Sequence, residues 1–364
     1  MSHHTEPGPA SSGVVLPFAQ EPRLIVTRGS DVTPVATRWL WPGWLAVGKL
    51  HLLAGPPGTG KTTIAASWAA ILSRGGTWPD GNPAEAGDVL LWSGEDGNAD
   101  TLNPRLRAAG ADMDRISTID GMVHAPPVRS PFDPARDLPH LASVLGSRQI
   151  RLLILDPIVA AVSGDSHKNA EVRRSLQPLV DLATTFDVAV LGITHLSKGT
   201  AGRDPLERIT GSLAFGAVAR LAFVTSVDAS GETEMPARRV VRVKSNLGPD
   251  GGGFRYAIEP CLLDRYPGVT SSSIRWGEVL SGDARTLLGA APDVDAMRPR
   301  DEAAQFLLQT LAAGPMSAAT VKALAAAAGL SERTLERAKA RLGLKSEKGG
   351  MDGGWTWRII DNPP

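Results

Sequence analysis

Residues 55–62 read Gly55-Pro56-Pro57-Gly58-Thr59-Gly60-Lys61-Thr62 and match the pattern G-x-x-x-x-G-K-[ST]. The stretch before them, Lys49 to Ala54 (KLHLLA), is apolar enough for a buried strand, and Lys61 to Ser73 (KTTIAASWAAILS) predicts a helix. Between a strand and a helix, this pattern binds phosphate because backbone N–H groups turn inward and the helix dipole faces the anion. We therefore predict a phosphate-binding loop inside an α/β fold.

The loop assigns a role to each of its residues. Lys61 is expected to reach the β- and γ-phosphates of ATP, and the Thr62 hydroxyl is expected to bind Mg²⁺. The backbone of residues 55–60, together with Thr63 at the start of the helix, is expected to surround the phosphates. ATP and Mg²⁺ are therefore the predicted cofactors.

Three more apolar runs end in polar residues that suit nucleotide chemistry. Residues 88–93 (DVLLWS) precede Glu95 and Asp96, residues 151–155 (RLLIL) precede Asp156, and residues 188–194 (VAVLGIT) precede His195. Ligands bind at the carboxyl ends of the strands in open α/β sheets, so we expect these side chains to gather near Lys61. Asp156 is expected to hold Mg²⁺ opposite Thr62, and either Glu95 or Asp96 can be the base that hydrolysis requires.

Strands alternate with helices from residue 34 to residue 263. Further strands are expected at 221–227 and 239–244, and helices at 98–109, 170–186 and 208–220. Residues 121–134 are expected to form a Pro-rich loop and residues 196–205 a Gly-rich basic loop. Such alternation indicates parallel βαβ units, and hence a twisted, mostly parallel sheet covered on both faces. Trp39, Trp41 and Trp44 are expected to pack at the entry to the first core strand, with stacking on a base as the alternative.

Composition excludes several classes of protein. The 364 residues include 38 Lys+Arg and 38 Asp+Glu, so a net charge of zero offers no global attraction to nucleic acid. No apolar run approaches the ~18 residues that a membrane span needs. The first residues lack the features of a signal peptide, and the single Cys261 fits a reducing compartment. We expect a cytoplasmic protein without a membrane partner, whose residues 1–33 form a disordered or extended tail.

The C-terminal part has a different character. Residues 264–297 are rich in Gly, Ser, Pro and Asp and predict a linker. Short helices are expected at 301–313, 318–328 and 331–342, and strands at 344–347 and 355–359, which is the order of a helix-turn-helix followed by a wing. Between residues 298 and 360, ten Lys/Arg outnumber six Asp/Glu. The helix at 331–342, the second of the helix-turn-helix, carries Arg333, Arg337, Lys339 and Arg341 and can enter a DNA major groove. A protein-interaction module is the alternative.

Several motifs together resemble one known family. These motifs are GPPGTGKTT, SGED, LLILDP, DSHKNAEVRR, THLSKG, RITGSLAFGAVAR and VKSN. Through them, residues 35–262 resemble the RecA-like branch of P-loop ATPases. The similarity is to plasmid RepA-type hexameric replicative helicases and to AAA-family ATPases of phages and prophages. This resemblance implies a RecA-like core that assembles into a homo-oligomer, a hexamer in those helicases, with single-stranded DNA in the central channel.

The resemblance also implies roles for particular residues. Glu95 matches the glutamate that activates water, and His195 matches a sensor of the γ-phosphate. Residues 197–204 match a loop that faces DNA. Arg220 and Lys244 match positions that act across a subunit boundary on a neighbour's γ-phosphate. The C-terminal winged-helix-like domain departs from the minimal helicase and offers duplex DNA a second contact.

Three functions are compatible with these features. The first is a ring-forming ATPase that moves on DNA, as a replicative helicase of a plasmid, phage or prophage does. The second is a DNA-binding regulator or initiator in which ATP switches the oligomeric state without unwinding. The third is a signalling ATPase of the clock-protein type that has no nucleic-acid substrate.

Overall fold

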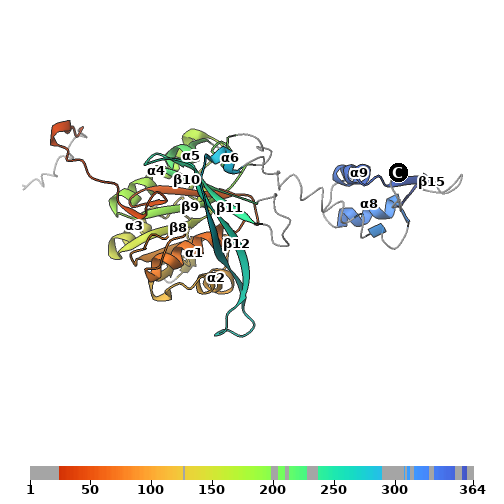
Figure 1. Ribbon diagram of the computed structural model, residues 1–364, viewed down its shortest axis with the longest axis horizontal. Helices are drawn as coiled ribbons and strands as arrows, with labels where there is room; N and C mark the ends of the chain where they lie inside the picture. Colours follow the sequence, from red (N-terminus) through yellow and green to blue (C-terminus); the bar gives the residue numbers. More distant parts are fainter. Residues whose placement is uncertain are drawn as a thin grey trace, which may run out of the picture. The chain divides into compact units, whose positions relative to one another are not determined.

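The computed structural model describes most of the chain (Figure 1). The described residues are 24–125, 128–197, 204–209, 213–227, 237–288, 307, 310–311, 315–327, 332–348 and 355–358. The chain separates into two units, Met1–Ala36 and Thr37–Pro364. In the first unit, residues 24–36 are exposed and contain one short 3₁₀ turn, η1 (Gly29–Asp31). Residues 1–23 of the predicted tail lie outside the described residues, and residues 24–33 are exposed.

A large sheet forms the centre of the second unit. Its strands are β3 (Leu50–Gly55), β4 (Asp88–Ser93), β5 (Ile116–Thr118), β8 (Ile150–Asp156), β9 (Ala189–His195), β10 (Leu221–Val227), β11 (Arg238–Ser245), β12 (Gly253–Leu262) and β13 (Thr270–Leu280). They lie in the order β13-β12-β11-β10-β3-β9-β8-β4-β5. The strands from β10 to β5 are parallel, whereas β11, β12 and β13 add to β10 in antiparallel fashion. The predicted α/β fold with a mostly parallel sheet is confirmed.

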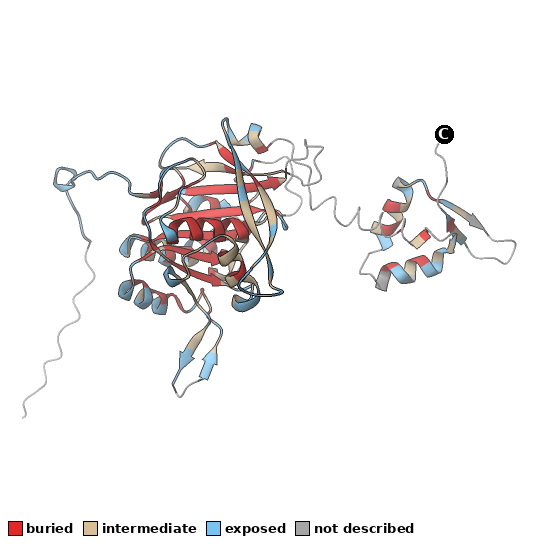
Figure 2. Cartoon of the chain, turned by 60° about the horizontal axis from the view of Figure 1, so that its bottom comes forward, coloured by how far each residue is buried: buried red, intermediate tan, exposed pale blue. Residues whose placement is uncertain are grey.

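Helices cover both faces of this sheet. They are α1 (Lys61–Arg74), α2 (Asn103–Ala108), α3 (Leu138–Ser147), α4 (Asn169–Thr185), α5 (Leu213–Val218) and α6 (Ala284–Leu288). Successive side chains of a strand point to opposite faces, so Leu53 packs with α1 and α2 while Leu52 packs with α3 to α6. Burial on both faces explains why the parallel strands are continuous apolar runs. Figure 2 shows the buried residues concentrated in these strands and in the helices beside them.

Aromatic side chains fill the layer beneath α1. Trp41 stacks on Trp44 and on Trp78, and Trp68 of α1 meets Trp41 edge to face. The short strands β1 (Trp39–Trp41) and β2 (Leu45–Ala46) pair with each other to present these rings. The predicted packing role of Trp41 and Trp44 is confirmed because both are buried in this cluster.

His51 is a buried polar residue beneath the same strands. Its Nε2 accepts the Ala46 N–H at 2.9 Å, and its Nδ1 donates to the Val190 carbonyl at 2.9 Å. Burial lowers the pKa of His51 to about 4, so the ring is neutral near pH 7. The imidazole therefore links β3, β9 and β2.

The prediction of a linker at 264–297 is wrong for residues 270–288, which form β13 and α6. The sequence of β13 is rich in serine, and its residues are exposed or partly exposed, so it shows no apolar run. Its strand conformation comes from antiparallel pairing with β12, in which Ile258 lies opposite Ile274 and Tyr256 opposite Trp276. The hairpin runs past α1 and α2 in Figure 1.

Smaller elements also differ from the sequence predictions. The predicted helix at 98–109 is a turn of π-helix, η2 (Asn98–Leu102), followed by α2. Among the described residues of the predicted helix at 208–220, those of α5 are helical, and residues 210–212 lie outside the described residues. The predicted loop at 121–134 contains a hairpin of β6 (Met122–His124) and β7 (Val128–Ser130). The 3₁₀ turns η3 (Met113–Arg115) and η4 (Ile158–Ala161) complete the core. No helix among the described residues has both the length and the apolar character to cross a membrane.

The C-terminal residues have a hydrophobic cluster of their own. The elements are β14 (Met316–Ser317), α8 (Ala318–Ala327), α9 (Glu332–Arg341), β15 (Lys345–Lys348) and β16 (Trp355–Arg358). The three strands form a sheet in the order β14-β16-β15, and Val321, Leu335 and Trp357 are buried together. The helices predicted at 318–328 and 331–342 and both predicted strands are present. The predicted helix at 301–313 lies mostly outside the described residues.

Candidate active site

The loop between β3 and α1 needs glycine at two positions. A Cβ on Gly55 would lie 1.8 Å from Oγ1 of Thr225, and one on Gly60 would lie 2.5 Å from Cδ1 of Ile258. Gly60 also has a φ of +83°, in the left-handed region that favours glycine. A side chain at position 55 would therefore collide with β10, whereas position 60 needs glycine mainly for its backbone conformation, because the Ile258 methyl is the movable end of a side chain.

Hydrogen bonds from β10 and β12 also hold this loop. The Thr59 hydroxyl contacts the Thr225 hydroxyl at 2.7 Å, and the buried Tyr256 hydroxyl donates to the Thr59 carbonyl at 2.7 Å. Burial raises the pKa of Tyr256, so the phenol keeps the proton that it donates. Strands β10 and β12 therefore hold the loop in shape.

Lys61 lies within the curve of the loop. Its Nζ donates to the carbonyls of Gly55 at 3.0 Å and Pro56 at 3.1 Å, and it lies 3.4 Å from Nδ1 of His195. Because β3 and β9 are in register, with Gly55 opposite His195, both side chains emerge at the carboxyl edge of the sheet. The predicted proximity of Lys61 and His195 is therefore confirmed.

Thr62 and Asp156 form the oxygen pair that the sequence predicts for Mg²⁺. The Thr62 hydroxyl donates to Oδ2 of Asp156 at 2.7 Å. Burial of Asp156, and then the negative charges of Glu95 and Asp96, raise its pKa to about 6, while the hydrogen bond from Thr62 opposes this rise. Mg²⁺ prefers oxygen ligands and would stabilise the buried carboxylate, so the two residues fit this ion.

The raised pKa of Asp156 predicts a gain in stability when its charge is removed. A folded-state pKa above the unfolded value stabilises the fold below pH 4 and loses that contribution as pH rises through 6. Without nucleotide or Mg²⁺, Asp156→Asn should therefore raise the free energy of unfolding at pH 8 by at most about 3 kcal/mol, from 1.36 kcal/mol per pKa unit.

Urea denaturation of wild type and variant at pH 4 and pH 8 measures this gain. The difference between the two proteins should be near zero at pH 4, because His51 titrates equally in both. Asp114→Asn, at an exposed aspartate, is the control variant. A variant less stable than wild type at pH 8 would contradict the assigned pKa shift.

Glu95 and Asp96 follow β4 but have different surroundings. The hydroxyl of Ser93 accepts both backbone N–H groups, at 3.2 and 2.9 Å, which turns the chain beside the loop. Asp96 forms an ion pair with Arg105 of α2. Glu95 has a side chain that is 56% exposed, and its Oε1 lies 3.9 Å from Nε2 of His195. Without nucleotide, Asp96 therefore pairs with Arg105, whereas Glu95 lies beside His195.

These side chains line one cleft of about 240 Å³. Its lining residues are Pro57, Gly58, Gly60, Lys61, Thr62, Thr63, Glu95, Asp96, Arg105, Asp156 and His195. The sequence predicted all of them except Arg105. The sequence does not indicate Arg105, because the position of this residue depends on the π-helical turn η2, which redirects the chain between β4 and α2.

Arg220 and Lys244 lie elsewhere. Arg220 immediately precedes β10, whose first residue pairs with His51 near the start of β3, and Lys244 lies opposite Ala222. Both are therefore at the amino edge of the parallel strands, whereas the phosphate loop is at the carboxyl edge. The Lys244 ammonium donates to the carbonyls at the end of α5, and its pKa is lowered by burial and then by Arg220.

The predicted loop after His195 is described only at its ends. Leu196 bridges to Ile209, and the Ser197 N–H donates to the Arg208 carbonyl at 2.7 Å. Residues 198–203 lie outside the described residues. The prediction that residues 197–204 face DNA therefore stays a prediction.

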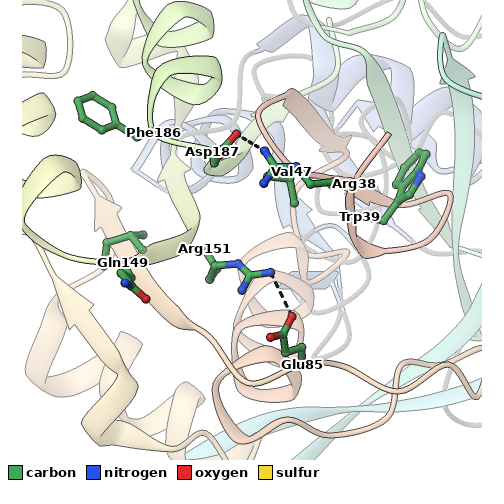
Figure 3. Close-up of a pocket in the computed structure, with 9 residues that line it drawn as sticks. Arg38, Trp39, Val47, Glu85, Gln149, Arg151, Phe186 and Asp187 are labelled. Carbon is green, nitrogen blue, oxygen red and sulfur yellow. Dashed lines mark hydrogen bonds and ion pairs between the residues drawn. The ribbon is translucent and has the colours of Figure 1, made fainter. Parts of the chain in front are cut away.

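A second and larger cleft, of about 520 Å³, opens at the amino edge of the sheet (Figure 3). Arg38 pairs there with Asp187, and Arg151 pairs with Glu85 at 3.5 Å. Each arginine is matched by a carboxylate, and no glycine-rich turn or helix start lines the cleft. Its size alone does not make it a phosphate site.

Strand order, loop geometry and the Thr62–Asp156 pair define a P-loop nucleotide-binding protein with a RecA-like core. A family model described as "AAA domain" matches residues 18–201, just over half of the chain. The chain therefore belongs to this family of P-loop ATPases. The matched region ends before β10, so the antiparallel strands and the C-terminal module lie beyond it. Comparison with curated proteins finds no match.

Proposed function

We propose that this protein is a ring-forming motor that hydrolyses ATP and acts on DNA, as replicative helicases of plasmids, phages and prophages do. The observation that carries the proposal is the separation of its cations between two edges of one sheet. Lys61 and Glu95 lie at the carboxyl edge, whereas Arg220 and Lys244 lie at the amino edge. From there they can reach a phosphate only on another subunit.

Hydrolysis in the cleft requires three contributions from the chain. Lys61 binds the β- and γ-phosphates, Glu95 orients water and accepts its proton, and Thr62 with Asp156 holds Mg²⁺. The bound ion supplies positive charge to the phosphate oxygens. His195 lies within reach of both Lys61 and Glu95 and shortly precedes residues 197–204 in the sequence. In this proposal His195 relays the state of the γ-phosphate to those residues.

The C-terminal module supplies a second contact to DNA in this proposal. On α9, Leu335 and Ala338 are buried, and Arg333 and Arg337 are exposed on the opposite face, one turn apart. Lys339 is engaged differently, because its ammonium lies 4.4 Å from the ring centre of Trp357. Arg333 and Arg337 are thus the cations that support duplex binding.

The same module supports a second candidate function. A DNA-binding regulator whose oligomeric state is switched by ATP needs only duplex contacts. The separate hydrophobic cluster around Trp357 suits a small duplex-binding domain with its own core. A motor needs single-strand contacts in its channel as well. Single-stranded DNA is therefore the ligand that separates the two functions.

ATPase rates of the full-length protein with single-stranded DNA, duplex DNA and no DNA provide the test. The motor proposal expects the largest stimulation by single-stranded DNA. Stimulation by duplex alone would favour the regulator, and no response to either DNA would favour an ATPase that has no nucleic-acid substrate.

Duplex affinity should depend on the two exposed arginines of α9. Arg333→Ala and Arg337→Ala should each weaken binding at every DNA sequence if they contact phosphates, and each should reduce the salt slope by about 1. Fluorescence anisotropy over a salt series measures both effects. Arg265→Ala removes one exposed arginine from the loop between β12 and β13 and is the control. If all three variants bind duplex DNA with the same affinity as the wild-type protein, the C-terminal module is better described as a protein-interaction module.

A further inference from the structure

Arg105 enters the nucleotide cleft from a helix that is firmly held. Leu102 and Leu106 are buried on either side of it, so that Arg105 is directed away from the core. The far end of α2 is fixed because Arg74 donates to the carbonyls of Ala109 and Gly110, at 2.8 and 2.9 Å. Arg105 therefore lines the cleft on a rigid support.

Arg107, on the same helix, has a different environment. Its Nε donates to Oδ1 of Asn103 at 2.7 Å, and its guanidinium lies 4.9 Å from the ring centre of Tyr266. It contacts the β12–β13 hairpin and does not line the nucleotide cleft. The helix thus carries one arginine in the cleft and one outside it, and Arg107 provides a matched control.

The balance of charge in the cleft favours a phosphate role for Arg105. Three carboxylates, Glu95, Asp96 and Asp156, line it, against the cations Lys61 and Arg105. The γ-phosphate of ATP brings further negative charge, which must be neutralised for transfer to occur. A planar guanidinium can bind two phosphate oxygens at once and so suits this task better than an ammonium does.

The ion pair with Asp96 leaves Arg105 available for such a contact. The two side chains keep 25% and 24% of their surface exposed, so a ligand in the cleft can reach the guanidinium. A phosphate with more charge and more oxygens than a carboxylate can therefore compete for the guanidinium. In the absence of nucleotide, Asp96 keeps the guanidinium at the cleft.

We propose that Arg105 binds the γ-phosphate of ATP from within the same chain, after exchanging Asp96 for a phosphate oxygen. The proposal rests on ATP hydrolysis at this cleft. In that reaction the water oxygen bonds to the γ-phosphorus as the bond to the bridging oxygen breaks, ADP leaves with that oxygen, and Glu95 takes the proton. Arg105 stabilises the charge on the transferred group and transfers no proton itself, because its guanidinium stays protonated.

The first test measures binding, independently of turnover. Titration of the full-length protein with ADP and with the β,γ-imido analogue of ATP gives the ratio of the two Kd values. Arg105→Ala should reduce the preference for the triphosphate by about tenfold, as expected for one lost charge-assisted contact. Arg105→Lys should recover part of it, and Arg107→Ala should keep the wild-type ratio. An unchanged ratio in folded Arg105→Ala would overturn the proposal.

The second test separates phosphate binding from simple neutralisation of Asp96. Arg105→Ala should lower kcat by about 10²- to 10³-fold, the usual loss for one preorganised donor. Because Asp96→Asn removes the negative charge that Arg105 balances, the double variant should be as slow as Arg105→Ala if Arg105 acts on phosphate. Recovery of kcat in the double variant would show that Arg105 serves only to neutralise Asp96.

These readouts also distinguish failure of the proposed function. If the wild-type protein binds ATP without hydrolysing it, the ratio of Kd values still tests Arg105. If the wild-type protein hydrolyses ATP and Arg105→Ala changes neither the ratio nor kcat, hydrolysis stands and the role of Arg105 is wrong.

Discussion

Replacing Glu95 with glutamine is expected to lower kcat for ATP hydrolysis by about 10²- to 10⁴-fold, the contribution of a positioned general base. ATP should still bind, because Lys61, the backbone of the loop and the Thr62–Asp156 pair are unchanged. Glutamine has nearly the shape of glutamate but cannot accept the proton from water. Lys61→Ala should instead weaken nucleotide binding and abolish turnover, because it removes charge from the β- and γ-phosphates.

Phosphate release and binding of a fluorescent ATP analogue, measured on both variants, separate these effects. Glu85→Gln is the control, because this glutamate side chain is 81% exposed in the second cleft, away from the phosphate loop. Near-normal turnover in Glu95→Gln would move the base to Asp96 or elsewhere. Loss of ATP binding in Glu95→Gln would mean that Glu95 supports the site structurally.

Replacing Arg220 with alanine is expected to leave ATP binding almost unchanged and to slow hydrolysis by about 10³- to 10⁵-fold, the range known for arginine fingers. The reason is position, since Arg220 is exposed at the amino edge of the sheet, and in the proposed ring it serves a neighbour's site. Mixing Arg220→Ala with Lys61→Ala subunits should restore part of the activity. An interface that joins the intact Lys61 of one variant to the intact Arg220 of the other can then form.

Arg148→Ala is a matched control for this experiment, because Arg148 is an exposed arginine at the same edge, just before β8. A mixture that exchanges subunits and stays inactive would show that Arg220 does not act in trans. Lys244 would then be tested in the same way. Its substitution is harder to interpret, because the Lys244 ammonium also binds the carbonyls that end α5.

The parallel part of the fold could be predicted because its strands are buried on both faces. Such strands, β3 and β8 among them, are continuous apolar runs and end at the residues that form the cleft. The antiparallel strands beyond β11 could not be predicted in the same way. β13 is polar and half exposed, and only its pairing with β12 makes it a strand.

Some residues of the candidate site could be predicted from the sequence, and others could not. Lys61, Thr62, Asp156 and His195 follow strands directly, so their meeting at one edge follows from parallel topology. The pairing of Arg105 with Asp96 depends on a π-helical turn that has no clear signal in the sequence. The placing of Arg220 and Lys244 at the far edge depends on the register of β10 and β11, which the motif alone does not give.

The most direct test of the proposed ring is the mass of the assembled protein. Glu95→Gln protein at micromolar concentration, with ATP, Mg²⁺ and single-stranded DNA, should sediment as a closed oligomer of several chains, and a hexamer is the expected size. The same sample without nucleotide shows whether assembly depends on ATP. A species with the mass of one chain, under conditions in which ATP is bound, would contradict the ring and with it the role of Arg220.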